Sequence, residues 1–276
     1  MTQLPSCVPI KPLFVILSWV HLLLSSKLCN NPITPSICES PTVMDGHSNM
    51  GNTWFSKVEK TIFKSNKIKY LGLILDNKLN WKHHISELSK KLSRSIGIIC
   101  KIKPFCSRNV SKSLLYSLFN SHLSYGLSTW GGNISVTQIQ KLQVLQNRIL
   151  RIIGSDPLND IVHCADIRKK LSILTVSNQI KMQISSLMWD YDNKSLPSEL
   201  AIRFAKISSV HNYQTRAAHH GSLYCKNVRS VNYGVKSFSY QGAKIYNELI
   251  EKDYFKLSKS KKSLMYKLKC ELLSSY

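Results

Sequence analysis

Apolar residues recur every three or four positions through much of the chain, a pattern typical of helices that bury one face. The spacing predicts helices from Trp81 to about residue 99, over 109–125, over 136–153 and over 167–188. Residues typical of helix boundaries support two of these ranges. Asn109 or Ser111 could cap the second helix, and Gly154 and Pro157 would end the third. The stripe of the first helix consists of Ile85, Leu88, Leu92, Ile96 and Ile99.

A segment with β character precedes these helices. The run from Ile68 to Leu75 is rich in branched and aromatic residues, and it ends in the turn signal Asp76-Asn77. Pairing of this strand with residues 53–63 predicts a small antiparallel hairpin. Because an isolated hairpin is marginal in water, it must pack on the helices that follow.

The predicted fold class is therefore mainly α: a helical bundle preceded by a small β-hairpin, with a loop-rich basic C-terminal segment. The expected divisions are an atypical leader over 1–50, the hairpin over 51–76, the helical domain over 77–196 and a basic, aromatic-rich region over 197–276. A hydrophobic content of 43% fits a globular chain rather than a disordered one.

Net charge adds an expected partner to this picture. The chain carries 38 Lys and Arg against 15 Asp and Glu, a formal charge of +23, which favours phosphate backbones or anionic membrane surfaces. Most of the excess lies in two blocks, 51–110 and 201–276, on either side of a nearly neutral centre.

The candidate nucleic-acid contacts are basic residues that fall off the apolar stripes or lie in these blocks. They are Lys90, Lys91, Arg94, Arg148, Arg151, Arg216, Lys259, Lys261, Lys262 and Lys267. The alternative is that these side chains only solvate helix faces. For Gln143, Gln146 and Asn147, on the third helix, solvation is the favoured interpretation.

Between residues 211 and 244 aromatic residues alternate with Arg and Lys. Aromatic faces can stack unpaired bases while neighbouring cations neutralise phosphates, but the same rings could instead pin a loop to the core. A basic helix is expected from Lys256 to Tyr276, with Leu264, Leu268 and Leu272 on one face.

The amino terminus offers a rival interpretation. Residues 13–24 form an apolar run too short to span a bilayer but of the length of a signal-peptide core. A secreted or membrane-attached helical interaction protein is therefore the alternative, with a membrane as its partner.

No cofactor or metal is expected. The eight cysteines contain no close-spaced pair of the kind that zinc sites use, and they suit a reducing intracellular compartment, nuclear or cytoplasmic. His83 and His84 are adjacent, so on a helix they point about 100° apart and cannot easily share one ion.

Three ordered stretches carry a resemblance to a known family. They are the run Lys67–Ile85 (KIKYLGLILDNKLNWKHHI), the segment 115–154 with its motif LQVLQNRILRIIG, and the segment 211–247 with HNYQTR, NYGVKSF and GAKIYN. Together they resemble the part of reverse transcriptases of non-LTR retrotransposons, of the jockey-like long-interspersed-element type, that follows the catalytic palm.

The resemblance implies a primer-grip hairpin, a helical thumb-like domain that contacts template-primer duplex, and a structural or helix-start role for His84. The family polymerises nucleotides with metal-binding aspartates of a Tyr/Phe-Ala-Asp-Asp turn upstream of the KYLG run, whereas this sequence contains no adjacent Asp pair. The expectation is therefore a non-enzymatic reverse-transcriptase fragment that binds RNA or an RNA-DNA duplex, with a non-functional relic as an alternative and no small-molecule substrate.

Overall fold

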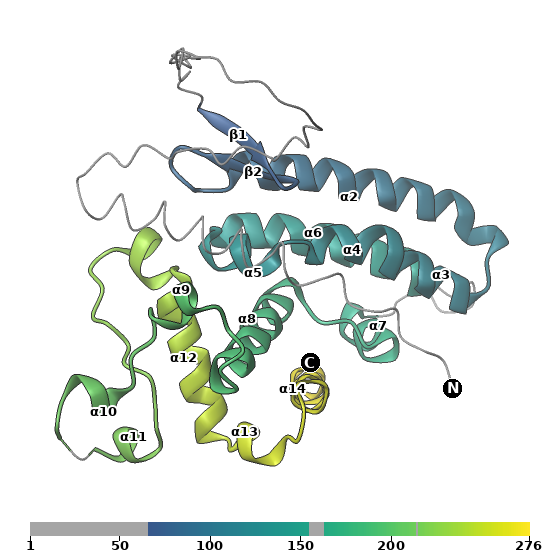
Figure 1. Cartoon of the computed structure of the whole chain (residues 1–276). Helices are drawn as coiled ribbons and strands as arrows, with labels where there is room; N and C mark the ends of the chain where they lie inside the picture. The colour runs from purple at the N-terminus through teal and green to yellow at the C-terminus, as the bar shows by residue number, and fades with distance from the viewer. Residues whose placement is uncertain (1–65, 155–162, 214) are drawn as a thin grey trace, which may run out of the picture.

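The computed structural model describes residues 66–154, 163–213 and 215–276, which form a mainly helical structure with one small hairpin (Figure 1). This confirms the predicted fold class. The apolar run 13–24 and the expected strand 53–63 lie outside the described residues. No helix within the described ranges is long and apolar enough to cross a membrane.

The hairpin lies inside the segment that was expected to form one strand. Strand β1 (Lys67–Tyr70) pairs antiparallel with β2 (Leu73–Asp76), and Leu71-Gly72 forms the two-residue turn. Both turn residues have positive φ, 44° and 80°, as a type I′ turn requires. The single-strand prediction was wrong, because Leu71 takes a position where Asn or Asp usually signals such a turn.

The predicted turn at Asp76-Asn77 is confirmed, and it starts the long helix α2 (Lys82–Ile102). The Asp76 carboxylate accepts hydrogen bonds from the backbone N–H groups of Lys78 at 3.1 Å and Asn80 at 3.0 Å. All five residues of the predicted apolar stripe are buried. The carboxylate thus supplies partners where the chain turns from strand to helix.

The second predicted helix is divided into α3 (Arg108–Leu114), a π-helical segment η2 (Leu115–Asn120) and α4 (Ser121–Ser124). Its N-cap is Ser107, whose hydroxyl accepts from the N–H of Val110, so neither of the predicted capping residues has that role. Short η1 (Lys103–Phe105) precedes it.

Beyond α4, α5 (Leu127–Trp130) and η3 (Gly131–Asn133) lead into α6 (Val136–Gly154), which confirms the third prediction. The fourth expected helix is two: α7 (Cys164–Leu171) and α8 (Val176–Asp192). Ser172 adopts a left-handed conformation (φ 55°) that ends α7, and Thr175 caps α8.

Helices α6 and α8 pack together, and α8 in turn contacts α12 and α14 (Figure 1). The short elements between α8 and α12 are α9 (Ser198–Ala201), α10 (Ile207–Val210), α11 (Arg216–His219) and η4 (Val231–Val235). Helix α12 (Phe238–Glu251) was not predicted. The basic terminal helix divides into α13 (Tyr254–Leu257) and α14 (Lys261–Ser274), of which Leu264 and Leu268 are buried.

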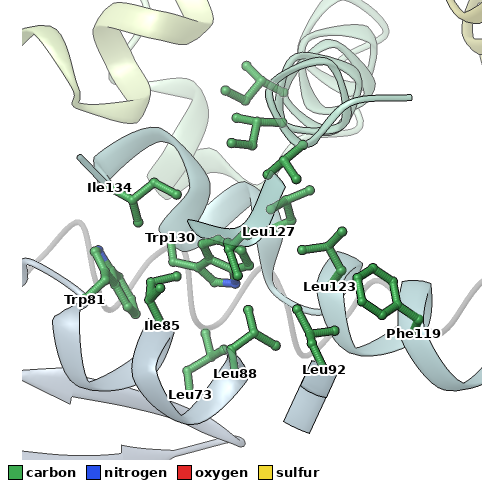
Figure 2. Packing of buried hydrophobic residues seen from close by; sticks show 14 of the residues in the cluster. Leu73, Trp81, Ile85, Leu88, Leu92, Phe119, Leu123, Leu127, Trp130 and Ile134 are labelled. Carbon is green, nitrogen blue, oxygen red and sulfur yellow. The ribbon is translucent and has the colours of Figure 1, made fainter. Parts of the chain in front are cut away.

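Trp130 lies at the centre of the apolar core beneath α2. Figure 2 shows its indole among residues of β2, α2, α4 and α5, and none of the side chain is exposed. Its indole N–H donates to the backbone carbonyl of Tyr125 at 2.9 Å, so the ring is buried without an unpaired donor. Tyr125 in turn donates its hydroxyl to the carbonyl of Leu71 at 2.6 Å, which joins the hairpin turn to this core.

Gly126, the residue that starts α5, is expected to tolerate no side chain. Its φ is +62°, and a β-carbon there would lie 3.1 Å from two methyl carbons of Leu73. Gly126→Ala should destabilise the protein by about 1–2 kcal/mol, because it adds left-handed strain and crowds a buried leucine. Chemical denaturation would measure the change.

Gly97 on α2 provides the matched control. A β-carbon there meets no atom within 4 Å, so Gly97→Ala should raise stability by up to about 1 kcal/mol through helix propensity. Equal effects of the two substitutions would contradict the conformational argument for Gly126.

Candidate nucleic-acid interface

The solvent side of α2 carries three of the predicted contacts, Lys90, Lys91 and Arg94, all of them exposed. They lie off the buried stripe, as the periodicity predicted. One acidic residue lies among them: Glu87 accepts a hydrogen bond from Lys90 at 2.8 Å, with both side chains about half exposed. Such an exposed pair contributes little to stability and leaves the surface strongly positive.

The hairpin adds a further cation to this surface. The pKa of Glu87 is lowered by its hydrogen bond and charge attraction to Lys90, and also by the charges of Arg94 and Lys67. Lys67 on β1 is therefore close enough to act on the same carboxylate as the α2 cations. We call Lys67, Lys90, Lys91 and Arg94 the α2 basic face.

His84 lies on α2 with its side chain buried in the apolar core. Its ring is 5.5 Å from that of Trp130 and 6.0 Å from that of Trp81, centroid to centroid. Burial, and secondarily the charge of Lys91, lowers its pKa from 6.5 to about 4. His84 is thus a neutral core residue, in agreement with the structural role that the resemblance implied.

Arg148 and Arg151 are exposed on α6, the helix that packs beside α2. Their exposure leaves both available to a ligand. Arg168 on α7 behaves differently: it is buried, donates to the Asn147 side chain and lies 5.9 Å from the ring centre of Tyr276. Not every arginine of this region therefore belongs to a binding surface.

The side chains of Gln143, Gln146 and Asn147 on α6 form hydrogen bonds within the protein, so the favoured interpretation that they only solvate the helix was wrong. The Gln143 side chain donates to Gln146 Oε1 at 2.7 Å and accepts from the N–H of Val176 at 3.0 Å. Gln146, which is buried, donates to the carbonyl of Leu174 at 2.9 Å. These amides fix the connection between α7 and α8 to α6.

The aromatic and basic residues between α9 and α12 divide into two groups. Phe238 packs edge-on against Phe204, with centroids 5.6 Å apart, and so anchors the segment to the core. Tyr213, in contrast, is 78% exposed and lies near His211, ring to ring at 5.7 Å. Exposed Arg216 follows on α11, so this part of the segment retains the features that suit unpaired bases.

Two of the four predicted lysines near α14 are held by the fold. Lys261 forms an ion pair with Asp190 at 2.6 Å, and Lys267 donates to the carbonyl of Leu257. Lys259 and Lys262 are exposed. The other eight of the ten predicted cations are exposed at the surface. One of them, Lys90, forms an ion pair with Glu87.

The described residues contain no group of His, Cys, Asp or Glu that could hold a metal ion, and their cysteines are free thiols. Sequence reasoning missed Lys67, although this basic residue opens the β-rich run that precedes the first predicted helix.

Comparison with known proteins gives one informative relative. Over 120 residues, 41% of this chain, the sequence is 28% identical to "RNA-directed DNA polymerase from mobile element jockey" of Drosophila melanogaster. The match spans 12% of that polymerase. No family model matches the chain, and no solved structure matches it. The likeness supports a relationship to reverse transcriptases of non-LTR retrotransposons.

Proposed function

We propose that this chain binds RNA or an RNA-DNA duplex through the α2 basic face, as a counterpart of the thumb and downstream region of a non-LTR reverse transcriptase. The observation that carries the proposal is the exposure of Lys90, Lys91 and Arg94 on α2 off its buried stripe, with Lys67 of the hairpin near enough to lower the pKa of Glu87. Cations from a hairpin and a long helix then face the same phosphate backbone.

The α2 basic face is carried by two elements that are fixed to the core, which favours it as a binding surface over cations scattered elsewhere on the protein. The hairpin is joined to the core by the Tyr125 hydroxyl, and α2 is buried along its full apolar stripe. Cations on such elements are held in register with one another, so a regular duplex can engage several at once.

Polymerisation is not part of the proposed function. Nucleotide addition needs carboxylates that hold metal ions near the incoming phosphate, and the sequence has no adjacent aspartate pair. The proposal is binding alone, and the likeness to the jockey polymerase supplies the family context.

The salt dependence of binding tests this surface. The full chain would be titrated into a labelled RNA-DNA hybrid, single-stranded RNA and duplex DNA over a salt series. In the variant K90A/K91A/R94A the slope of log K against log salt should flatten by about 2–3, because each lost phosphate contact releases fewer counterions. Binding of the hybrid or RNA by the unmodified chain should persist near physiological salt.

The control removes equal charge elsewhere. Lys169 and Lys170 on α7 and Lys194 after α8 are exposed and distant in sequence from the α2 basic face, so K169A/K170A/K194A should leave the slope almost unchanged. Equal flattening in both variants, or weak binding of all three nucleic acids that disappears by about 0.2 M salt, would point to unspecific polyelectrolyte attraction instead.

A further inference from the structure

A pocket of about 180 Å³ lies between η2 and α4, the start of α8, and α14. It is distinct from the α2 basic face. Its lining combines one aromatic ring, Tyr116, with three carboxamides, Asn120, Gln179 and Gln183, and one lysine, Lys269. A cavity of about 150 Å³ in another protein admits a benzene ring, so this volume suits one flat ring system.

One polar atom of the lining is buried without a partner. Gln179 donates its side-chain N–H groups to Asn120 Oδ1 at 3.3 Å and to the carbonyl of Leu174 at 3.1 Å. Its Oε1 is buried and has no hydrogen-bond partner within the described part of the chain. This acceptor is thus open to a hydrogen-bond donor from a molecule bound in the pocket.

The lysine of the lining, Lys269, lacks a partner of opposite charge among the residues that the structure describes. Lys269 is half-buried, and burial followed by repulsion from Lys112 lowers its pKa. No carboxylate of the described residues pairs with it. An ammonium group that lines a pocket without an anionic partner would be stabilised by a bound anion, and a phosphate would offset the cost of its burial.

We propose that this pocket binds a single unpaired nucleotide, with its base beside Tyr116 and the carboxamides and its phosphate at Lys269. Carboxamides present the paired donor and acceptor that match base edges, and an aromatic ring offers a stacking face. The inference rests on the proposed function, since a bound strand would supply the nucleotide.

The test uses the full chain and small probes. The four nucleoside 5′-monophosphates, the parent nucleosides and inorganic phosphate would each be titrated by NMR. At least one monophosphate should bind about tenfold more tightly than both its nucleoside and inorganic phosphate, because only the nucleotide fills both halves of the site. Nucleotides that bind no better than phosphate would reduce the pocket to an anion site, and no binding at all would overturn the proposal.

Two variants and one control locate the site. K269Q should weaken nucleotide binding about tenfold through the phosphate, and Q179L should weaken it through the base. K194Q removes an exposed lysine after α8 that does not line the pocket and should have no effect. Unchanged binding in K269Q would contradict the assignment even if Q179L disturbed the fold.

Failure of this proposal is separable from failure of the proposed function. Loss of nucleotide binding in K269Q, with hybrid binding and its salt slope intact, would confirm a separate nucleotide pocket. Hybrid binding that K90A/K91A/R94A weakens, together with no mononucleotide binding by the unmodified chain, would overturn the pocket and leave the α2 basic face in place.

Discussion

Trp130→Ala should destabilise the fold by about 3–5 kcal/mol, the range typical of deleting a large buried aromatic side chain. The side chain is fully buried at the meeting point of β2, α2 and α5 (Figure 2). Its loss would leave a cavity beside His84, whose ring centroid is 5.5 Å from that of Trp130. It would also leave the carbonyl of Tyr125 without its indole donor. Since the hairpin turn is bonded to Tyr125, the hairpin should loosen with the core.

Urea denaturation followed by circular dichroism would measure this loss. Trp130→Phe should cost less, because it keeps an aromatic ring and removes the hydrogen bond and part of the volume. Tyr213→Ala, at a side chain that is 78% exposed, should change stability by no more than about 0.5 kcal/mol. A loss below about 1 kcal/mol for Trp130→Ala would show that the surrounding core does not depend on the indole.

Acidification is expected to remove about 3 kcal/mol of stability through His84 alone. Its pKa is about 4 in the folded protein and 6.5 in the reference state, so the unfolded chain binds the proton more tightly. The stability is therefore fully present above pH 6.5 and is lost as the pH falls from 6.5 to about 4. Each pKa unit of difference corresponds to about 1.4 kcal/mol.

His84→Leu isolates this effect from other titrating groups. Leucine fills the site without a proton to bind, although it removes the ring nitrogen that faces the N–H of Ile74 at 3.5 Å. Free energies of unfolding at pH 7 and pH 4.5 should differ by roughly 2–3 kcal/mol less in the variant than in the unmodified chain. An identical pH dependence in the two proteins would mean that His84 is already accessible to protons in the fold.

Helices α2 and α6 could be predicted from sequence because each packs one continuous face on the core, so a single period describes it. The division between α7 and α8 could not. The apolar spacing continues across Ser172, while the break depends on a left-handed residue and on the Thr175 cap. Helix α12 was missed because aromatic and basic residues alternate there. Its buried face also includes Gly242, where Phe204 packs against the backbone, so the apolar pattern lacks a side chain at that position.

Charge placement was predictable only in part. The exposed positions of Lys90, Lys91 and Arg94 follow from helical periodicity, but the ion pair of Lys261 joins it to Asp190, 71 positions earlier. The amides of α6 likewise find partners 28 and 33 residues away. Such pairs depend on tertiary packing, for which local pattern carries no information.

The segment between α9 and α12 is closed at its base. Lys206 and Leu223 form an antiparallel bridge, and the Asn247 side chain of α12 accepts from the N–H of Leu223 at 2.8 Å and donates to its carbonyl at 3.0 Å. The stretch between Lys206 and Leu223, which includes α10 and α11, is thus an excursion from the fold. The bridge holds its two ends together whatever the length of the stretch. The entropy of closing a loop rises slowly with length, by about 0.6 kcal/mol per doubling. Evolution can therefore lengthen or replace the stretch that carries Tyr213 and Arg216 at little cost to the rest of the molecule, which makes it the part of the chain best suited to acquire new specificity.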